Sequence, residues 1–333
     1  MNTHELYDLV VIGSGAAGLG AGLYAGRYRM KTLVVGGSFG GATATAGTIH
    51  NYPGAPEADG YELMKLMKGQ CKDLGVLIET GWVTSLMRDG SCFKIIVGEG
   101  EKAKEIGSKT IIFAMGTERR KLGVPGEEAF AAKGVHYCIT CDGPLYHDKT
   151  IAIVGGGDGS VKGVNLAAEY AKKIYLIARG PQLRAEPINL EHMQALGDKV
   201  EVLYETQVKE ILGDGVLNAI KLDKEVNGST TVSIDGLFIE IGSKPQTKLP
   251  EDLGVALDER SYIVTDNMMS TNIPGVYAAG DTTNFFGPFK QTITGAATGS
   301  VAATSAYNFY KQHGNLCEMH WVPVMLEGAG IHA

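Results

Sequence analysis

A glycine loop near the N-terminus follows a strand-like run and precedes a helix-like segment. The run at 7–12 (YDLVVI) is typical of a buried parallel strand, and the small residues at 19–29 are typical of a helix. Gly13 permits a tight turn, Gly15 lets backbone approach a pyrophosphate, and Gly18 lets the helix pack on the strand. Because a helix N-terminus offers N–H donors to phosphates, we predict a βαβ dinucleotide-binding unit rather than an ordinary glycine turn.

The same unit recurs later in the chain. A strand-like run at 150–154 (TIAIV) enters a second loop, in which Gly155 and Gly157 match the first two fingerprint positions and Ser160 takes the third. A helix to about residue 172 is expected to follow. The alternative is a nucleotide-like fold that holds no nucleotide.

Two strand-like segments, 109–115 followed by Gly116 and 236–242 followed by Pro245, indicate where the chain leaves and re-enters the first unit. We therefore predict an α/β protein of two Rossmann-like dinucleotide-binding domains, the second inserted into the first. The first domain is expected over 1–117 and 246–313, the inserted domain over 118–245, and a C-terminal tail over 314–333.

Composition excludes several other classes of protein. The 46 glycines among 333 residues show no Gly-X-Y period, and 44% of the residues are apolar, which argues against collagen and against disorder. A net charge of −7 argues against nucleic-acid binding. The uncharged stretches at 9–26 and 291–310 are rich in glycine or in Thr and Ser, so we expect no membrane span. Five cysteines and an acidic N-terminus without a signal-peptide pattern favour a cytoplasmic protein.

Two of the cysteines form a Cys-x-x-Cys motif at 138–141 (CITC), which is typical of a redox dithiol in a cytosolic protein. Half of a zinc site is the alternative, but the other three cysteines supply no second Cys-x-x-Cys motif, so no metal site is predicted. Asp142 follows directly and could exchange a proton with a departing thiolate. It could equally cap a helix.

At this point the sequence resembles a family, the low-molecular-weight thioredoxin reductases, which are FAD-dependent disulfide reductases. The resemblance covers nearly the whole chain. It is carried by the first glycine loop and by six further segments: HNYPG at 50–54, AMGT at 114–117, CITCDG at 138–143, GGGD at 155–158, GVYAAGD at 275–281 and KQT at 290–292.

The resemblance implies a redox role for three residues and a partner. Cys141 would exchange electrons with FAD, Cys138 would attack the disulfide of thioredoxin, and Asp142 would act as acid and base. It also implies a homodimer whose inserted domain rotates, so that the dithiol alternately meets flavin and thioredoxin. The implied FAD contacts are Gly13, Ser14, Gly15, Ala16, Ala17, Gly37, Gly41, Ala42, Asn51, Val83, Gly116, Gly280, Asp281, Lys290, Gln291 and Thr292.

The second domain departs from the family pattern where NADPH would bind. The family has His-Arg-Arg and a further Arg after the second strand of this domain, whereas here Arg179 and Arg184 remain, Ala178 replaces the His and Gly180 replaces the second Arg. A 2′-phosphate is best held by guanidinium groups. After the second loop, residues 159–163 (GSVKG) also lack the Ser-Ala and Glu pair of the family.

We therefore predict a thioredoxin-disulfide reductase whose electron donor is reduced ferredoxin or a deazaflavin and for which NADPH is doubtful. An ordinary NADPH-dependent reductase is one alternative. A FAD-binding redox-sensing module without turnover is another. In the tail, Trp321 or His332 could fold over a flavin or across a dimer, although a solvated tail is the simpler expectation.

Overall fold

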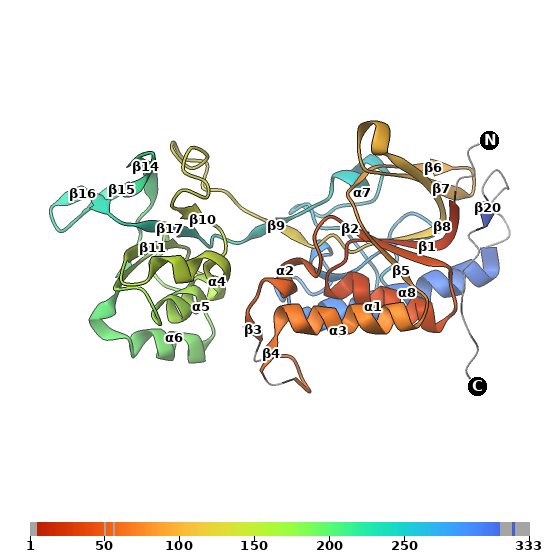
Figure 1. Ribbon diagram of the computed structural model, residues 1–333, viewed down its shortest axis with the longest axis horizontal. Coiled ribbons are helices and arrows are strands. Elements are labelled where there is room, and N and C mark those ends of the chain that lie inside the picture. The colour runs from red at the N-terminus through yellow and green to blue at the C-terminus, as the bar shows by residue number, and fades with distance from the viewer. Residues whose placement is uncertain (1–4, 50, 56, 314–321, 324–333) are drawn as a thin grey trace. The chain divides into compact units, whose positions relative to one another are not determined.

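A computed structural model describes residues 5–49, 51–55, 57–313 and 322–323 (Figure 1). The chain divides into two compact units. Unit 1 comprises Met1–Thr117 and Pro245–Ala333, and unit 2 comprises Glu118–Lys244. The expectations for Trp321 and His332 lie outside the described residues.

An eight-stranded sheet forms the centre of unit 1, with the strand order β5-β2-β1-β8-β7-β6, β19 beside β8 and β20 beside β1. The pairs among β5, β2, β1, β8 and β19 are parallel, whereas β6, β7 and β8 pair antiparallel. Nearly all of β1 is buried, as expected for a parallel strand covered on both faces. The strands are β1 (Glu5–Ile12), β2 (Thr32–Gly36), β5 (Leu77–Thr80), β6 (Val83–Asp89), β7 (Cys92–Val97), β8 (Lys104–Phe113), β19 (Val276–Ala278) and β20 (Val322–Pro323).

Three long helices lie along one side of this sheet (Figure 1). A Cβ at Gly299 in α8 would lie 2.0 Å from the carbonyl oxygen of Ala17 in α1, so these helices approach closely only because the residues are small. This packing explains the uncharged stretches, and within the described residues no helix is long and apolar enough to cross a membrane. The helices are α1 (Ala16–Arg27), α3 (Gly60–Asp73) and α8 (Thr292–His313); shorter elements are α2 (Gly41–Ala44), β3 (Thr48–Ile49), β4 (Ala58–Asp59), η1 (Gly100–Lys102), α7 (Lys248–Asp252) and η4 (Gly280–Thr282).

Unit 2 is built on a five-stranded parallel sheet of order β10-β17-β11-β12-β13. Helices pack on one face, and an antiparallel sheet, β14-β15-β16, packs on the other. The main strands are β10 (Val135–His136), β11 (Thr150–Val154), β12 (Lys173–Ile177), β13 (Val200–Leu203) and β17 (Gly236–Ile239). The remaining elements are α4 (Ile139–Asp142), η2 (Gly143–Tyr146), α5 (Asp158–Ala167), α6 (Pro187–Gln194), η3 (Gly197–Lys199), β14 (Val208–Asp214), β15 (Val216–Val226) and β16 (Ser229–Ser233); β9 (Thr117–Arg119) and β18 (Ser243–Pro245) pair where the chain passes between the units.

The predicted α/β architecture is confirmed, but some boundaries differ. The helix after the second glycine loop ends at Ala167 instead of continuing to about residue 172. It stops because the backbone of the following turn is engaged elsewhere: the carbonyl of Tyr170 accepts from Asp148, and the amide of Lys172 donates to Lys149.

Candidate flavin and dithiol sites

The first glycine loop has the geometry that the sequence predicts. Gly13 has φ +116°, and a Cβ there would lie 2.1 Å from the carbonyl oxygen of Ala114. A Cβ at Gly18 would lie 1.8 Å from the carbonyl oxygen of Gly13, so helix and strand meet without room for a side chain. The first turn of α1 contains no acid, and no side chain caps its N–H groups. These donors suit the phosphates of a dinucleotide.

Several predicted cofactor residues gather around this loop. The amide of Gly40 donates to the carbonyl of Ser14, which fixes the segment after β2 beside the loop. Gly41 then faces Gly15: a Cβ built on Gly41 would lie 3.5 Å from the Cα of Gly15, which leaves a cradle lined by backbone. Asn51 Nδ2 donates to Gln291 Oε1 over 3.0 Å. The hydroxyls of Thr43 and Thr292 are 3.1 Å apart.

A half-buried carboxylate lies at the same end of the sheet. Asp281 in η4 and Lys290 line one small hollow, and burial raises the pKa of Asp281 while the nearby Lys290 opposes this rise. Lys290 Nζ donates to the carbonyl of Thr283 over 2.5 Å, whereas the carboxylate of Asp281 makes no hydrogen bond within the described residues. A half-buried carboxylate that is shielded from part of its water and has no donor can still accept hydrogen bonds. This site therefore fits a ligand that brings a hydroxyl or N–H group, as a flavin nucleotide does.

Four other predicted contacts lie on the segments that follow β2, β5 and β8. Gly37 packs against the indole of Trp82, and Val83 begins β6 directly after it. Gly116, with φ +64°, follows β8, and a Cβ there would meet no atom within 4 Å. Ala42 lies in α2, next to Gly41.

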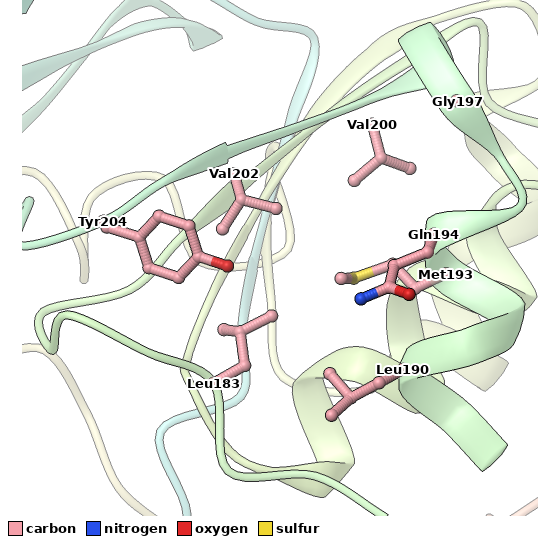
Figure 2. A pocket seen from close by; sticks show the side chains of 8 residues that line it. All are labelled: Leu183, Leu190, Met193, Gln194, Gly197, Val200, Val202 and Tyr204. Carbon is pink, nitrogen blue, oxygen red and sulfur yellow. The ribbon is translucent and has the colours of Figure 1, made fainter. Parts of the chain in front are cut away.

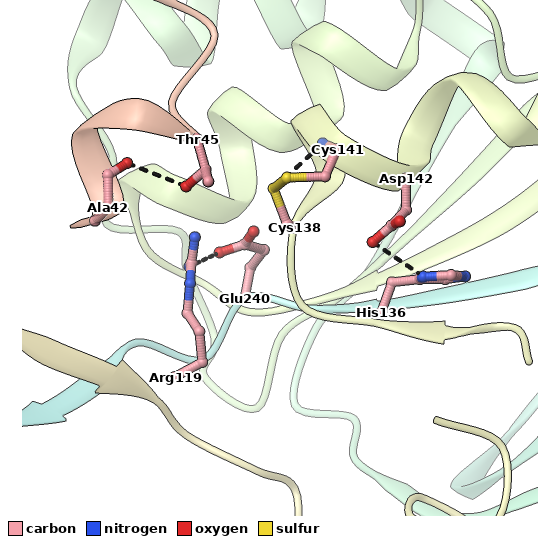
Figure 3. Close-up of a disulfide and its surroundings, with 8 residues drawn as sticks. All are labelled: Ala42, Thr45, Arg119, His136, Cys138, Cys141, Asp142 and Glu240. Atoms are coloured by element: carbon pink, nitrogen blue, oxygen red, sulfur yellow. Dashed lines mark hydrogen bonds and ion pairs between the residues drawn. A yellow bond between two sulfur atoms is a disulfide. The ribbon is translucent and has the colours of Figure 1, made fainter. Parts of the chain in front are cut away.

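Cys138 and Cys141 form a disulfide at the junction between β10 and α4 (Figure 3). Their Cα atoms are 5.3 Å apart. Cys138 precedes the first residue of α4, and its sulfur accepts from the amide of Cys141 over 3.2 Å. Cys141 is exposed and Cys138 is half-buried. A hydrogen bond to sulfur favours the thiolate over the thiol once the bond is reduced, so Cys138 is suited to nucleophilic attack.

Asp142 faces a histidine that the sequence reasoning missed. His136 Nδ1 lies 3.1 Å from Asp142 Oδ2, as Figure 3 shows, and His136 Nε2 lies 2.7 Å from the hydroxyl of Tyr146. Burial is the main cause of a raised pKa for Tyr146, and the charge of Asp142 adds to it. Asp142 stands at the N-cap position of η2, but within the described residues its side chain makes no capping hydrogen bond, so the carboxylate is left to His136. The arrangement connects Asp142 to two groups that can donate or accept protons.

Cys71 is a different kind of cysteine. It is fully buried, its thiol donates to the carbonyl of Leu19 over 3.2 Å, and burial raises its pKa to about 12. Such a thiol is chemically inert at neutral pH. Among the residues that the structure describes, no group of three or more His, Cys, Asp or Glu side chains could hold a metal ion.

The second glycine loop keeps the close packing of the first. A Cβ at Gly155 would lie 2.3 Å from the carbonyl oxygen of Glu240 and 2.8 Å from the Cβ of Ser160. Ser160 is fully buried, and its hydroxyl donates to the carbonyl of Gly157 over 2.7 Å. Serine therefore fills the third fingerprint position without opening the loop.

Charged side chains of the chain itself gather at the start of α5. Lys162 Nζ lies 2.7 Å from Asp158 Oδ2 and 3.5 Å from Glu186 Oε2. Asp158 Oδ1 also accepts from the amide of Glu186 and from Asn189 Nδ2. The segment after β12 is thus tied to the helix that follows the glycine loop.

The arginines of this segment are available to a ligand. Arg179 and Arg184 are exposed, and neither guanidinium makes a hydrogen bond or an ion pair within the described part of the chain. Gly180 lies between them in the chain, and a Cβ there would make an ordinary contact with the carbonyl oxygen of Gln182 at 3.7 Å. Ala178 is fully buried, and its methyl side chain offers no polar group to a ligand.

An ion pair between a buried carboxylate and a half-exposed guanidinium lies beside the same loop. Glu240 pairs with Arg119 (Figure 3), and burial raises the pKa of Glu240 although the guanidinium opposes this rise. A Cβ at Gly159 would lie 3.9 Å from Glu240 Oε2.

A separate hollow of about 420 Å³ lies between α6 and β13. Figure 2 shows Met193 of α6 and Val202 of β13 at this hollow, together with Leu183, which precedes α6, and Tyr204, which follows β13. Neither the glycine loop nor the cysteines line it.

Comparison with known proteins identifies the family. Residues 7–305 match the family model described as pyridine nucleotide-disulphide oxidoreductase. A thioredoxin reductase from Listeria innocua is 35% identical over 92% of this chain and 95% of its own length. The crystal structure of Lactococcus lactis thioredoxin reductase superimposes with a TM-score of 0.84, at 35% identity over 92% of this chain and 99% of that one.

A second structural relative has a different printed name. It is a ferredoxin-flavin thioredoxin reductase from Clostridium acetobutylicum, with a TM-score of 0.50 at 31% identity, and the match covers 93% of this chain and 99% of that one. The chain therefore belongs to the pyridine nucleotide-disulphide oxidoreductases, a family of flavoproteins, and within that family to the low-molecular-weight thioredoxin reductases.

Proposed function

We propose that this protein reduces the disulfide of thioredoxin, with FAD as cofactor and Cys138 and Cys141 as the redox-active pair. The observation that carries the proposal is the Cys138–Cys141 disulfide, placed at a strand-to-helix junction with Cys141 exposed. The thioredoxin reductases that match over nine-tenths of the chain support it.

The first glycine loop, the backbone at Gly40 and Gly41, and Asp281 would hold FAD. The donors of α1 would face its phosphates, and Asp281 would accept from a hydroxyl of its polyol chain. When bound, the flavin supplies two-electron transfer between an electron donor and the cysteine pair.

The remaining steps are thiol–disulfide exchange by residues of unit 2. Two electrons and two protons convert the Cys138–Cys141 bond to two thiols. The Cys138 thiolate attacks one sulfur of the thioredoxin disulfide, forms a mixed disulfide and releases the other sulfur as a thiolate, which Asp142 protonates. Cys141 then attacks the sulfur of Cys138, thioredoxin leaves with two thiols, and the Cys138–Cys141 bond forms again. His136 would position Asp142 and replenish its proton.

We also propose that the electron donor is reduced ferredoxin or a deazaflavin. Gly180 and the buried Ala178 remove two groups that would bind a 2′-phosphate, and Lys162 is engaged by Asp158. The ferredoxin-flavin thioredoxin reductase among the structural relatives is consistent with such a donor.

NADPH is the second candidate donor, and Arg179 and Arg184 favour it because both are exposed and without an ion pair in the described residues. Anaerobic mixing of the purified protein with NADPH, NADH, reduced ferredoxin and reduced deazaflavin tests both donors. We expect the flavin absorbance to bleach with ferredoxin or the deazaflavin. Prompt bleaching at micromolar NADPH would favour the second candidate.

We propose a homodimer as the working assembly, from the resemblance to the family. Sedimentation of the flavin-loaded protein across a concentration series tests it. A monomer at all concentrations that support turnover would contradict this assembly.

A further inference from the structure

The first dinucleotide-binding unit lacks a residue that its fingerprint normally includes. A carboxylate about 20 residues after the glycine loop, at the end of the second strand, usually binds a ribose hydroxyl. Here β2 ends at Gly36, Gly37 follows, and no Asp or Glu occurs between Asp8 and Glu57. The adenosine end of the site must therefore be recognised by another group.

The indole of Trp82 occupies the space in question. A Cβ at Gly37 would lie 2.0 Å from Cε2 of Trp82, so the ring lies directly against the backbone where a side chain at position 37 would begin. The amide of Gly81 donates to the carbonyl of Gly36 over 3.1 Å, which holds the residue before Trp82 at the end of β2. The indole of Trp82 can lie in this position only because residue 37 is glycine and has no side chain.

A short series of contacts also connects Trp82 to the glycine loop. The Ser14 hydroxyl donates to the carbonyl of Ser38 over 3.0 Å, and Ser38 adjoins Gly37. Trp82 nevertheless remains 61% exposed, which is high for the largest apolar side chain. An aromatic face is therefore open to solvent beside the loop that would bind the pyrophosphate.

We infer that Trp82 recognises the adenosine half of FAD by stacking on the adenine, in place of the missing carboxylate. The inference rests on the proposed function, because it requires FAD in the first unit. Every base has a flat π-face, and an indole binds it without a charged partner. A protein partner on the exposed ring is the competing use of Trp82, and the experiment separates the two.

The flavin is first removed from the protein, which is then titrated with FAD or with FMN, a flavin that lacks adenosine. Flavin fluorescence gives the dissociation constant for each. We expect Trp82→Ala to weaken FAD binding by about 5- to 150-fold, the range for one base stacked on an aromatic residue. FMN binding should not change. Trp82→Phe should retain FAD within about three-fold, since phenylalanine also stacks.

Met87→Ala is the matched control, because Met87 is another exposed apolar residue on β6, at 47%. It should leave both constants unchanged. Equal weakening of FAD and FMN by Trp82→Ala, or no change in either, would overturn the inference while leaving the proposed function intact. A wild-type protein that binds no FAD would contradict both the role of Trp82 and the proposed function.

Discussion

His136 Nδ1 lies 3.1 Å from Asp142 Oδ2, and Asp142 follows the redox-active Cys141 in the chain. The imidazole is itself held on its other side by Tyr146 and is stacked on Phe238, with ring centroids 5.3 Å apart. Asp142 is therefore not an isolated surface acid. The buried imidazole of His136 fixes the orientation of the Asp142 carboxylate.

Removing the imidazole should slow thiol exchange. We expect His136→Leu to lower thioredoxin turnover by about ten-fold and to change the pH profile. The loss is smaller than the roughly 10²–10⁴-fold contribution of a general acid because His136 acts through Asp142 and does not itself transfer the proton to sulfur. His136→Asn keeps an N–H donor near the carboxylate and should restore most of the activity. Stopped-flow measurement of thioredoxin thiols between pH 6 and 9 checks both variants. An unaltered pH profile in His136→Leu would show that the histidine is only structural.

Breaking the Arg119–Glu240 pair should destabilise the protein in a pH-dependent way. Burial raises the pKa of Glu240 in the folded protein above its ordinary value of 4.5. Below pH 4.5 the carboxyl is protonated in both states and costs no stability. As the pH rises through the raised pKa, the carboxylate becomes charged in the folded protein and this charge destabilises the fold. Arg119→Met removes the group that reduces this cost. We expect a loss of about 1–2 kcal/mol at pH 7.5, below the range for fully buried pairs because Arg119 is half-exposed.

Thermal unfolding across pH 4 to 8 provides the measurement. The difference between Arg119→Met and wild type should be small near pH 4 and should grow as the pH rises. Arg120→Met, next in the chain, serves as the control. A difference that is constant with pH would mean that the charge of Glu240 does not matter.

Restoring an arginine at position 180 should strengthen NADPH binding. A Cβ at position 180 would lie 3.7 Å from the carbonyl oxygen of Gln182, an ordinary contact distance, so the substitution causes no clash at Cβ. One charge-assisted hydrogen bond contributes about 1.5–3 kcal/mol, which corresponds to ten-fold or more in the dissociation constant. NADPH should bind more tightly to Gly180→Arg while NADH, which lacks the 2′-phosphate, should not. If both nucleotides gain equally, the arginine acts through net charge and not through the phosphate.

Cys71 should resist alkylation while the reduced dithiol reacts. With a pKa of about 12, only about one Cys71 in ten thousand is a thiolate at pH 8, and the side chain is fully buried. Mass spectrometry of peptides after reduction and brief exposure to iodoacetamide should show modification at Cys138 or Cys141. Labelling of Cys71 at a comparable rate in the folded protein would contradict its assignment as an inert core residue.

The sequence predicts the local parts of this molecule well. Both glycine loops, the strands that enter them and the Cys138–Cys141 motif are short segments whose chemistry depends on neighbours in the chain. By contrast, the antiparallel strands β6, β14, β15 and β16 mix exposed polar residues with buried apolar ones, which gives a weak sequence signal. These strands were not predicted.

The parts of the sites that depend on tertiary packing were also missed. His136 lies two residues before Cys138, but its contact with Asp142 requires α4 to turn back onto β10. Trp82 and Gly37 are far apart in sequence, and only the pairing of β2 with β5 brings them together. A histidine on the strand that leads into the cysteine motif is the one signal that could have been used.

The most direct test of the proposed function is anaerobic reduction of thioredoxin by the flavin-loaded protein, measured as thioredoxin thiols formed per flavin. Wild type should turn over many times with reduced ferredoxin or a reduced deazaflavin. Cys138→Ser and Cys141→Ser should keep the flavin and form no thioredoxin thiols beyond background. Undiminished turnover in either variant, or a wild-type flavin that is reduced without any thioredoxin thiols appearing, would contradict the account.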